Sequence, residues 1–464
     1  MSTTLDKAQL VVIGAGPGGY AAAFRAADLG LDVTIVEPEA NPGGVCLHRG
    51  CIPSKAFLHA AKVIREAEEA PLMGVSFGKP TIDIDAMREW KNGIVTTLTE
   101  GLGGKAQKKN VHHVRGLARF VGAKKLSIDL VDGGVAEMEF DQAIIATGSR
   151  PAMPPFAKET SERIIDSTGA LDPTRIPQSL LIIGGGYIGL ELGCVYAALG
   201  SAVTVVEMLP QIMTGADRDL VSQVKRRLDK QFEAILTNTR VLALEEQKDG
   251  VTTILENNKG EQTTRIFDQV LVSVGRRPNL DGIGLEQAGV EIVDGFVKVD
   301  ALRRTTAEGI FAIGDVTGQP MLAHKATHEG YVAADVAAGK TAAFEPRAIP
   351  AVCFTDPEVA WVGLTETEAK AEGRKVKTAK IPWRSIGRTL TLGRDDGMTK
   401  MIIDPETDLV LGVGLAGPGA GELISEAALA IEMAARWQDV AMTIHPHPTL
   451  SESVMEAAEM FFQD

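Results

Sequence analysis

The chain has 464 residues, enough for about three domains, and its 45% hydrophobic and 23% charged residues are ordinary for a well-packed globular protein. A net charge of −14 argues against nucleic-acid binding, which needs a basic surface. No run approaches the roughly 18 apolar residues that span a bilayer, so we expect no membrane association and a cytoplasmic location.

Residues 8–40 predict a strand, a turn, a helix and a second strand. The motif Gly14-x-Gly16-x-x-Gly19 follows an apolar run and opens an alanine-rich stretch. In a dinucleotide-binding unit the first glycine makes a tight turn, the second admits a pyrophosphate, and the third lets helix pack on strand. Glu37 lies 23 positions after Gly14, where an acid can accept hydrogen bonds from ribose hydroxyls. The segment therefore predicts a dinucleotide site.

Two of the four cysteines, Cys46 and Cys51, lie five residues apart in the next segment. In a cytosolic protein such a pair is typically catalytic or metal-binding. An ideal helix would place their Cα atoms about 8–9 Å apart, beyond the roughly 7 Å limit for a disulfide. A bridge here therefore requires distorted backbone, and a strained bridge is easily reduced. The residues expected to supply the distortion are Gly43, Gly44, Gly50 and Pro53.

A zinc site is the competing interpretation of this segment. Its ligands would be Cys46, His48, Cys51 and His59. Their spacing matches no common zinc pattern, so we expect no metal.

Residues 85–110 predict one long amphipathic helix, and residues 111–145 predict short antiparallel strands. The run that starts at Ala143 ends in Thr147 and Gly148, and the prolines from 151 to 155 then predict a linker.

The strand–turn–helix unit recurs at residues 179–207. Gly184-x-Gly186-x-x-Gly189 follows an apolar run, and Glu207 lies 23 positions after Gly184, as in the first copy. A single such motif is weak evidence, but two copies in the same context predict two dinucleotides in one chain. Cys194 and Cys353 lie in apolar surroundings and are predicted to be inert core residues.

The end of the second unit echoes the first, because residues 270–278 (VLVSVGRRP) resemble residues 143–151 (AIIATGSRP). The repeat therefore covers a whole domain. Residues 306–315 predict a further strand. From about residue 348, alternating strands and helices predict an α+β unit.

Nine motifs, spread from end to end, make the chain recognisable. They are GAGPGGY, GGVCLHRGCIPSK, ATGSRP, GGGYIGLELG, VGRRPN, FAIGDV, MLAHKA, FTDPEVAWVG and HPHPTLSE. With them the chain resembles the pyridine-nucleotide disulfide oxidoreductase family, and within it the flavoproteins that oxidise dihydrolipoamide. It departs from that pattern at His48 and Arg49, where relatives often carry Asn and Val, and at Pro446, where Ala is common.

The resemblance implies an α/β fold with two Rossmann-like dinucleotide-binding domains and a C-terminal α+β dimerisation domain. The FAD domain would comprise residues 1–149 and 276–347. The NAD domain would comprise residues 150–275, and the dimerisation domain residues 348–464.

Two cofactors follow from the resemblance, FAD bound non-covalently and NAD⁺/NADH. The residues expected to contact FAD are Gly14, Gly16, Gly19, Glu37, Thr147, Gly148, Asp315 and Ala323. Those expected to bind NAD are Gly184, Gly186, Gly189, Glu207 and Gly275, with Tyr187 covering the flavin until nicotinamide displaces it. Lys55 and Glu191 match a pair that lies against the flavin ring in relatives.

The resemblance also implies the chemistry. A redox disulfide would join Cys46 and Cys51, and His447 would be the acid–base, oriented and charged by Glu452. A thiol with a pKa near 8.5 is mostly protonated at neutral pH, so dihydrolipoamide needs such a base before its sulfur attacks Cys46. Cys51 would then be released against the flavin, and a hydride would pass on to NAD⁺. His445 is expected to support His447.

The alternatives are another FAD-dependent disulfide reductase, a subunit that chiefly docks in a multienzyme complex, and a transhydrogenase. Glutathione-type reductases would need an arginine near Glu207, mercuric reductases carry a C-terminal cysteine pair that this tail lacks, and transhydrogenases lack the complete cysteine pair. Retention of both cysteines, His447 and Glu452 argues against a mere docking role.

The expected partners are a second copy of the chain, lipoyl domains, and the acyltransferase subunit of 2-oxo-acid dehydrogenase complexes. The acidic balance predicts electrostatic docking of a basic domain. The acidic residues expected to contribute to that docking surface are Glu422, Glu426 and Glu432.

Overall fold

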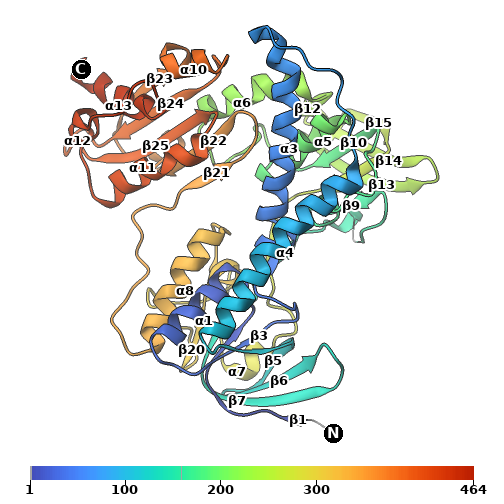
Figure 1. Cartoon of the computed structure of the whole chain (residues 1–464), viewed down its shortest axis with the longest axis vertical. Helices are drawn as coiled ribbons and strands as arrows, with labels where there is room; N and C mark the ends of the chain where they lie inside the picture. The colour runs from blue at the N-terminus through green and yellow to red at the C-terminus, as the bar shows by residue number, and fades with distance from the viewer. Residues whose placement is uncertain (1–2, 158, 464) are drawn as a thin grey trace. The chain divides into compact units, whose positions relative to one another are not determined.

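The computed structural model describes residues 3–157 and 159–463. The chain divides into two compact units, each built from three stretches (Figure 1). The first unit comprises Met1–Pro53, Glu89–Ala152 and Arg276–Glu345. The second comprises Ser54–Arg88, Met153–Gly275 and Pro346–Asp464.

A mixed sheet organises the first unit. Its order is β4-β3-β2-β7-β6-β5, and β1 and β20 also pair with β7. The pairs among β2, β3, β4, β7 and β20 are parallel, whereas β5, β6 and β7 form an antiparallel meander. The strands are β1 Thr3–Thr4, β2 Ala8–Ile13, β3 Val33–Val36, β4 His112–Val114, β5 Gly116–Gly122, β6 Lys125–Leu130, β7 Val135–Ile145 and β20 Ile310–Ala312.

Helices α1 (Pro17–Asp28) and α8 (Ala323–Ala337) lie side by side next to this sheet (Figure 1). Their close approach depends on glycine, because a Cβ on Gly330 would lie 2.6 Å from the carbonyl oxygen of Gly18. The other helices that begin in this unit are α2 Gly44–Arg49, α3 Cys51–Glu69 and α7 Leu285–Ala288, and α4 Ile84–Lys108 ends in it. The long helix predicted over residues 85–110 is confirmed as α4.

The strand predicted over residues 306–315 is much shorter than expected. Only β20 is extended, and a 3₁₀ turn, η4 (Gly314–Thr317), follows it. Gly309 and Gly314 have φ angles of +73° and +77°, and these left-handed positions bracket the strand. The expected Asp315 therefore lies in a turn at the carboxyl end of a parallel strand.

The two echoing segments pair with each other. β8 (Ser149–Pro151) lies antiparallel to β17 (Arg276–Pro278), so part of the predicted linker is a strand. A small hairpin, β18 (Ile292–Val293) with β19 (Phe296–Val297), completes the strands of this unit.

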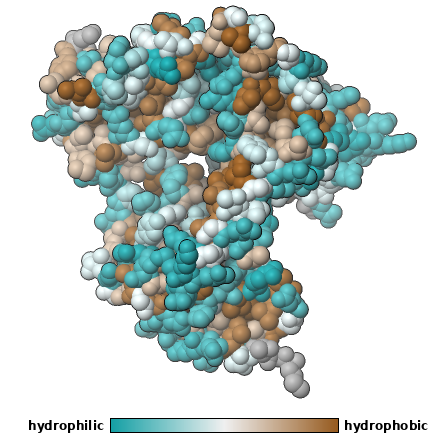
Figure 2. All heavy atoms as spheres, viewed as in Figure 1, coloured by the Kyte–Doolittle hydropathy of each residue, from teal (hydrophilic) through white to brown (hydrophobic). Residues whose placement is uncertain are grey.

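The second unit contains a five-stranded parallel sheet of order β12-β11-β10-β16-β9. Beside it, β13, β14 and β15 form an antiparallel sheet whose projecting β14–β15 hairpin is hydrophilic (Figure 2). The strands are β9 Ile164–Ile165, β10 Ser179–Ile183, β11 Ala202–Val206, β12 Ala234–Leu236, β13 Thr239–Gln247, β14 Gly250–Asn257, β15 Gln262–Phe267 and β16 Gln269–Val272. The helices are α5 Tyr187–Leu199 and α6 Arg218–Gln231.

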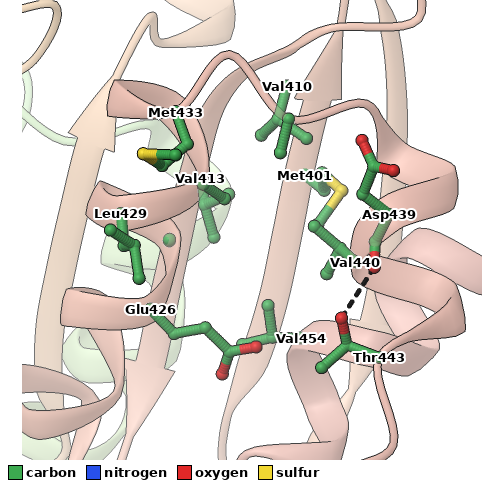
Figure 3. A pocket seen from close by; sticks show the side chains of 13 residues that line it. Met401, Val410, Val413, Glu426, Leu429, Met433, Asp439, Val440, Thr443 and Val454 are labelled. Carbon is green, nitrogen blue, oxygen red and sulfur yellow. Dashed lines mark hydrogen bonds between the residues drawn. The ribbon is translucent and has the colours of Figure 1, made fainter.

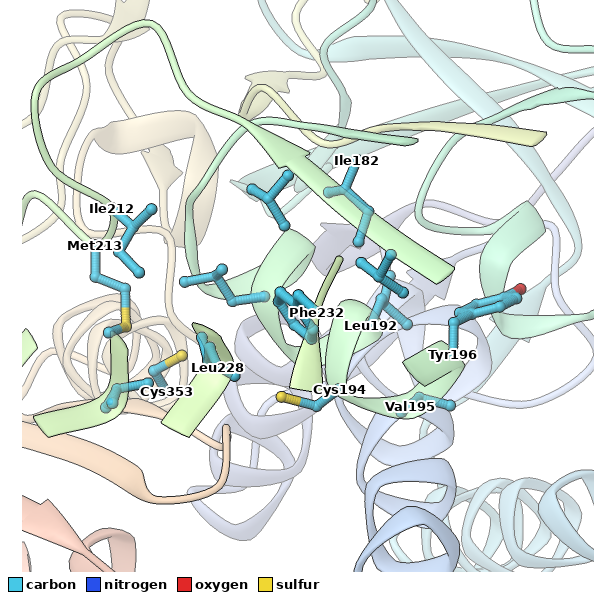
Figure 4. Packing of buried hydrophobic residues seen from close by; sticks show 14 of the residues in the cluster. Ile182, Leu192, Cys194, Val195, Tyr196, Ile212, Met213, Leu228, Phe232 and Cys353 are labelled. Carbon is cyan, nitrogen blue, oxygen red and sulfur yellow. The ribbon is translucent and has the colours of Figure 1, made fainter. Parts of the chain in front are cut away.

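The core of this part packs the apolar faces of α5 and α6 against the parallel sheet (Figure 4). Cys194 and Cys353 are both buried in it, which confirms that they are core residues. Burial raises the pKa of the Cys194 thiol to about 12, so it stays protonated and unreactive at neutral pH.

The C-terminal part is an antiparallel sheet of order β21-β22-β25-β24-β23, with α11 packed on β22 and β25. This arrangement confirms the α+β texture predicted from residue 348 onward. The strands are β21 Ala351–Cys353, β22 Glu358–Gly363, β23 Lys377–Pro382, β24 Met398–Ile403 and β25 Val410–Gly417. The helices are α9 Glu366–Ala371, α10 Gly387–Thr391, α11 Ala420–Glu432, α12 Trp437–Met442 and α13 Glu452–Glu459.

A buried ion cluster links α6 to this sheet. The side chain of Lys400 is 2% exposed and pairs with Asp217 at 2.7 Å, Asp219 at 3.2 Å and Glu366 at 2.6 Å. Burial by itself would raise the pKa of Asp217, but hydrogen bonds from Lys400 and from residues 366 and 367 hold it below its ordinary value. The hydrogen bond from Lys400 likewise lowers the pKa of Glu366.

Replacing Lys400 with methionine should destabilise the protein by about 3–5 kcal/mol, because it leaves the buried Asp217 without its cation. Asp219 and Glu366 keep a second cation, Lys380. Since the folded pKa values lie below the unfolded ones, the wild-type stabilisation is full above about pH 5 and is lost as the pH falls through the lowered values. The variant should lose less stability on acidification. Thermal unfolding at pH 7.5 and pH 4.5 measures both effects. The exposed pair Lys225–Asp229 supplies the control Lys225→Met, and an equal effect there would contradict the assignment.

Candidate active site

The first glycine motif forms the predicted turn between β2 and α1. Gly14 has φ +98°, and a Cβ there would lie 2.4 Å from the Ala146 carbonyl oxygen. A Cβ on Gly19 would lie 2.0 Å from the Gly14 carbonyl oxygen, so helix and turn touch. By contrast, a Cβ on Gly16 would meet nothing closer than 3.9 Å. A side chain at Gly16 would thus meet only Gly44 of the cysteine segment, at an ordinary contact distance.

The second motif repeats this geometry. Gly184 has φ +107°, and a Cβ there would lie 2.4 Å from the Ser273 carbonyl oxygen. A Cβ on Gly189 would lie 2.4 Å from the Gly184 carbonyl oxygen, whereas one on Gly186 would have no neighbour within 4 Å. Neither α1 nor α5 has a side-chain cap at its N-terminus, so their first amides suit an anionic group.

The two acids that follow the motifs are held alike. Glu37 accepts a hydrogen bond from the Ala15 amide at 2.7 Å, and Glu207 accepts one from the Gly185 amide at 2.7 Å. Each carboxylate thus lies at the end of the second strand, facing its glycine turn. Each glycine turn and the acid that faces it form what we call a cradle. Both cradles fit a dinucleotide, with backbone amides for its phosphates and a carboxylate for its ribose.

The cysteine segment is two helices with a break between them. Cys46 lies in α2, the backbone turns at Gly50 (φ −145°, ψ −109°), and Cys51 begins α3. A Cβ on Gly50 would lie 2.9 Å from the Val45 carbonyl oxygen, so the break depends on glycine. Pro53 does not distort the chain as expected, because it lies in the first turn of α3, where its missing N–H costs nothing.

Both cysteines lie close enough to Tyr20 of α1 to influence it electrostatically. Burial raises the pKa of Tyr20 in α1, and Cys46 and Cys51 raise it further. A Cβ on Gly44 would lie 2.4 Å from Cα of Gly16. The cysteine segment thus lies directly against the first glycine turn.

His48 and Arg49, the departures from the family pattern, contact the segment that precedes the cysteines. A ring nitrogen of His48 lies 3.2 Å from the Asn41 carbonyl oxygen, and Arg49 forms an ion pair with Glu39. Within residues 3–157 and 159–463, no group of three or more His, Cys, Asp or Glu side chains is arranged to hold a metal ion.

Lys55 and Glu191 form the expected pair in the second unit. Lys55 Nζ lies 2.8 Å from Glu191 Oε2, and the Glu191 side chain is 4% exposed. Glu191 Oε1 accepts a hydrogen bond from the Phe354 amide at 2.9 Å, and Lys55 Nζ lies 4.4 Å from the centre of the Phe354 ring. The ammonium group is therefore fixed by a carboxylate and a ring face. Tyr187, the first residue of α5, is 39% exposed.

Three further residues expected to contact FAD, Thr147, Gly148 and Asp315, lie near the paired strands β8 and β17. Thr147 donates to the Asn279 carbonyl at 2.8 Å, and the Asn279 amide side chain returns a bond to the Thr147 carbonyl at 2.9 Å. Gly148 has φ +67°. Asp315 accepts a hydrogen bond from Ser149, whose hydroxyl also accepts from Arg276 at 2.7 Å. Gly275 has φ +115°, and Ala323 is the first residue of α8.

Sequence reasoning missed Glu329, which fixes the turn that carries Asp315. Its side chain is fully buried, accepts a hydrogen bond from the Gly314 amide at 2.6 Å, and pairs with Arg303 at 2.9 Å and Lys325 at 3.2 Å. The available signal was an acid four residues after a lysine in the alanine-rich α8.

His447 and Glu452 form a hydrogen-bonded pair in the second unit. His447 Nδ1 lies 2.8 Å from Glu452 Oε1, and the Thr449 amide donates to Glu452 Oε2 at 2.7 Å. The Thr449 amide, and after it His447, lowers the pKa of Glu452. The carboxylate therefore stays charged at neutral pH. The His447 side chain is 78% exposed, so its other nitrogen can receive a proton from outside this unit.

His445 is placed differently. Its side chain is 4% exposed, and Nε2 lies 2.7 Å from Glu426 Oε1. Glu426, expected to contribute to an acidic docking surface, is thus engaged within the chain. Glu422 and Glu432 are exposed, as expected.

Residues 8–330 match the family model described as pyridine nucleotide-disulphide oxidoreductase. Residues 349–458 match the model of that family's dimerisation domain. In the part of the chain that the structure describes, no helix is both long and apolar enough to cross a membrane.

Curated relatives match over nearly the whole chain. Dihydrolipoyl dehydrogenase of Vibrio parahaemolyticus is 50% identical over 98% of this chain and 96% of its own length. That of Haemophilus influenzae is 50% identical over 98% of this chain and 95% of its own. The enzyme of Geobacillus stearothermophilus is 47% identical over 97% of this chain and 96% of its own.

Solved structures share the fold. LpdA from Mycobacterium tuberculosis superposes with a TM-score of 0.89 at 27% identity, covering 99% of both chains. The HOCl-induced flavoprotein disulfide reductase RclA from Escherichia coli has a TM-score of 0.86 at 26% identity, covering 97% of this chain and 99% of that one.

Proposed function

The chain belongs to the pyridine nucleotide-disulphide oxidoreductase family, and within it we propose that it oxidises protein-bound dihydrolipoyl groups at a Cys46–Cys51 disulfide with FAD and NAD⁺. Relatives of about 50% identity carry the name dihydrolipoyl dehydrogenase. The observation that carries the proposal is the break at Gly50, which puts Cys51 at the N-terminus of a 19-residue helix. Amides and dipole at such an end stabilise a thiolate, which suits Cys51 as the sulfur released when the bridge opens.

The thiol chemistry follows from four side chains. His447 takes a proton from one substrate thiol, and Glu452 stabilises the imidazolium that results. The substrate thiolate attacks Cys46 Sγ, the bond between Cys46 and Cys51 breaks, and Cys51 leaves as a thiolate. The second substrate thiol then displaces Cys46 Sγ, which takes that thiol's proton as it leaves. This closes the oxidised dithiolane and leaves Cys46 as a thiol and Cys51 as a thiolate.

The first cradle would hold FAD and the second NAD⁺. When bound, the flavin would supply the two-electron acceptor for the reduced cysteines, and NAD⁺ would supply the final hydride acceptor. We assign Gly14, Gly16, Gly19 and Glu37, with Thr147, Gly148, Asp315 and Ala323, to the first. We assign Gly184, Gly186, Gly189, Glu207 and Gly275 to the second. Lys55, Glu191 and Tyr187 are assigned to the flavin ring.

The chain forms a homodimer through its C-terminal dimerisation domain. We propose that His447 of one copy serves the disulfide of the other. The exposure of His447, together with its short link to Glu452, supports a base that acts outside its own unit.

NAD⁺ should be preferred over NADP⁺ by roughly 10²-fold or more in kcat/KM, because Glu207 would repel a 2′-phosphate by several kcal/mol. Glu207→Arg should narrow or reverse the preference, whereas Glu233→Arg on the exposed surface of the same unit should not. Steady-state rates with both cofactors measure this. Equal efficiency in the wild type would contradict the role of Glu207.

The proposed partners are lipoyl domains and the acyltransferase subunit of a 2-oxo-acid dehydrogenase complex in the cytoplasm. With 61 acidic and 47 basic side chains, docking of a basic domain should be electrostatic. Raising salt from roughly 0.05 to 0.5 M should weaken binding mainly through a slower on-rate, because exposed charges are screened within about 10 Å. A surface-binding experiment measures this, with turnover of free dihydrolipoamide as the control. Salt-independent association would favour an apolar interface instead.

The test of the proposed function is a pair of steady-state assays on the purified holoenzyme. One supplies dihydrolipoamide and NAD⁺, and the other supplies glutathione disulfide and NADPH. The proposal predicts NADH formation in the first assay and negligible turnover in the second. The reverse pattern would assign the chain to another disulfide reductase.

A further inference from the structure

The segment that carries His447 has no regular secondary structure. It runs from the end of α12 at Met442 to the start of α13 at Glu452. The His447 ring is mostly exposed and is oriented by Glu452 through one nitrogen. Placing this ring for proton transfer therefore depends on what holds the backbone of the segment.

The segment is anchored through the ring of His445. Its Nδ1 lies 2.8 Å from the Thr443 carbonyl oxygen, and its Nε2 lies 2.7 Å from Glu426 Oε1. A carbonyl only accepts, so Nδ1 carries a hydrogen and donates it. The contact with Glu426 then needs a second proton, shared between Nε2 and the carboxylate. Because both ring nitrogens are engaged and the side chain is 4% exposed, His445 cannot itself act as a base toward substrate.

Glu426 provides a rigid anchor. It projects from α11 toward the segment at Thr443, at the edge of a pocket of about 270 Å³ between α11 and α12 (Figure 3). Ile424, Ala427 and Ile431 of the same helix are buried in the core of this part. The Glu426–His445 bond therefore ties an irregular segment to a well-packed helix.

The other end of the segment is held independently. The Thr449 hydroxyl donates to the Pro446 carbonyl at 2.7 Å, and the Thr449 amide donates to Glu452. His447 thus lies between two attachments, one at His445 and one at Thr449.

We infer that His445 and Glu426 are a positioning pair that sets the place of His447 for proton transfer. The inference rests on the proposed function, since it concerns the base of that reaction. Displacing a catalytic group by about 1 Å can lower the rate roughly 10²-fold, so loss of the pair should lower kcat.

The decisive comparison is Glu426→Ala with Glu426→Gln in the full-length holoenzyme. A glutamine can donate from its amide to Nε2 of a neutral His445, whose Nδ1 hydrogen still reaches Thr443, so the anchor survives. Alanine removes it. Glu426→Ala and His445→Ala should each lower kcat for dihydrolipoamide by about 10–100-fold with little change in KM, whereas Glu426→Gln should stay close to wild type.

Two controls separate positioning from general damage. Oxidation of NADH by an artificial electron acceptor does not use His447 and should be unchanged in all three variants, as should flavin content. His112→Ala removes an exposed histidine that pairs with Asp32 at 3.5 Å, and it should have no effect.

Each outcome of these assays either supports or contradicts the positioning role. Alanine variants with normal kcat would overturn the inference, and so would a Glu426→Gln variant as impaired as Glu426→Ala. If the alanine variants lost NADH oxidation by the artificial acceptor as strongly as they lost dihydrolipoamide oxidation, the pair would have only a structural role, and the inference would be wrong. If the wild type does not oxidise dihydrolipoamide, the proposed function fails, yet ¹⁵N-histidine NMR still tests the pair. The His447 ring signals should then shift in Glu426→Ala and not in Glu426→Gln, and unchanged signals in both would overturn it.

Discussion

Replacing Cys51 with serine should reduce dihydrolipoamide oxidation to background and abolish the long-wavelength absorbance band that two-electron reduction gives the holoenzyme. Cys51 is the sulfur we place against the flavin, at the N-terminus of α3, where a thiolate is stabilised. Cys46→Ser should also lose turnover, because Cys46 is the sulfur attacked by substrate. It should nevertheless keep or even reveal the band, since Cys51 remains.

Anaerobic titration with dithionite, followed by absorbance, measures the band in both variants. Cys194→Ala is the matched control, because this thiol is buried in the core and should affect neither the band nor turnover strongly. A band that survives in Cys51→Ser and disappears in Cys46→Ser would exchange the roles of the two sulfurs.

His447→Ala should lower dihydrolipoamide oxidation by roughly 10²–10⁴-fold, the usual loss when a general acid–base is removed. The side chain is 78% exposed, so its removal leaves no cavity and should not unfold the protein. Flavin binding and NADH oxidation by artificial acceptors should survive. Glu452→Gln should have a smaller effect, because it keeps a hydrogen-bond partner for His447 and removes only the charge.

Steady-state assays with dihydrolipoamide and with an artificial acceptor, run on the same preparations, measure this contrast. If both activities fell together, His447 would be structural. If neither fell, another group would have to supply the base.

The features that sequence predicted well are those fixed by a few adjacent residues. Gly14 and Gly184 have positive φ angles and lie against the backbone of a neighbouring segment, so only glycine fits there. In the sequence this requirement appears as a glycine motif between a strand and a helix. The Glu452 partner of His447 is also local, because it is five residues away at the start of α13. Local spacing therefore predicted the two cradles, whereas the His–Glu pair was implied by the resemblance of the segment HPHPTLSE to the family.

Two of the features that sequence missed depend on contacts between distant residues. Glu329 is buried because its carboxylate closes the turn at Gly314, and Glu426 meets His445 across 19 positions. The strand predicted over residues 306–315 was too long, because the prediction did not consider that Gly309 and Gly314 take left-handed conformations, which end the strand. Pro53 was expected to distort the backbone, but the break between the two helices lies at Gly50, and a proline in the first turn is compatible with a helix.

The activity of mixed dimers shows whether His447 of one copy serves the disulfide of the other. One chain carries His447→Ala and the other Cys46→Ser, and each homodimer alone should be nearly inactive with dihydrolipoamide. If the working site joins the disulfide of one copy to His447 of the other, the heterodimer should regain one working site of two. If each chain used its own histidine, the heterodimer would stay as inactive as its parents, and the proposed site across two copies would be wrong.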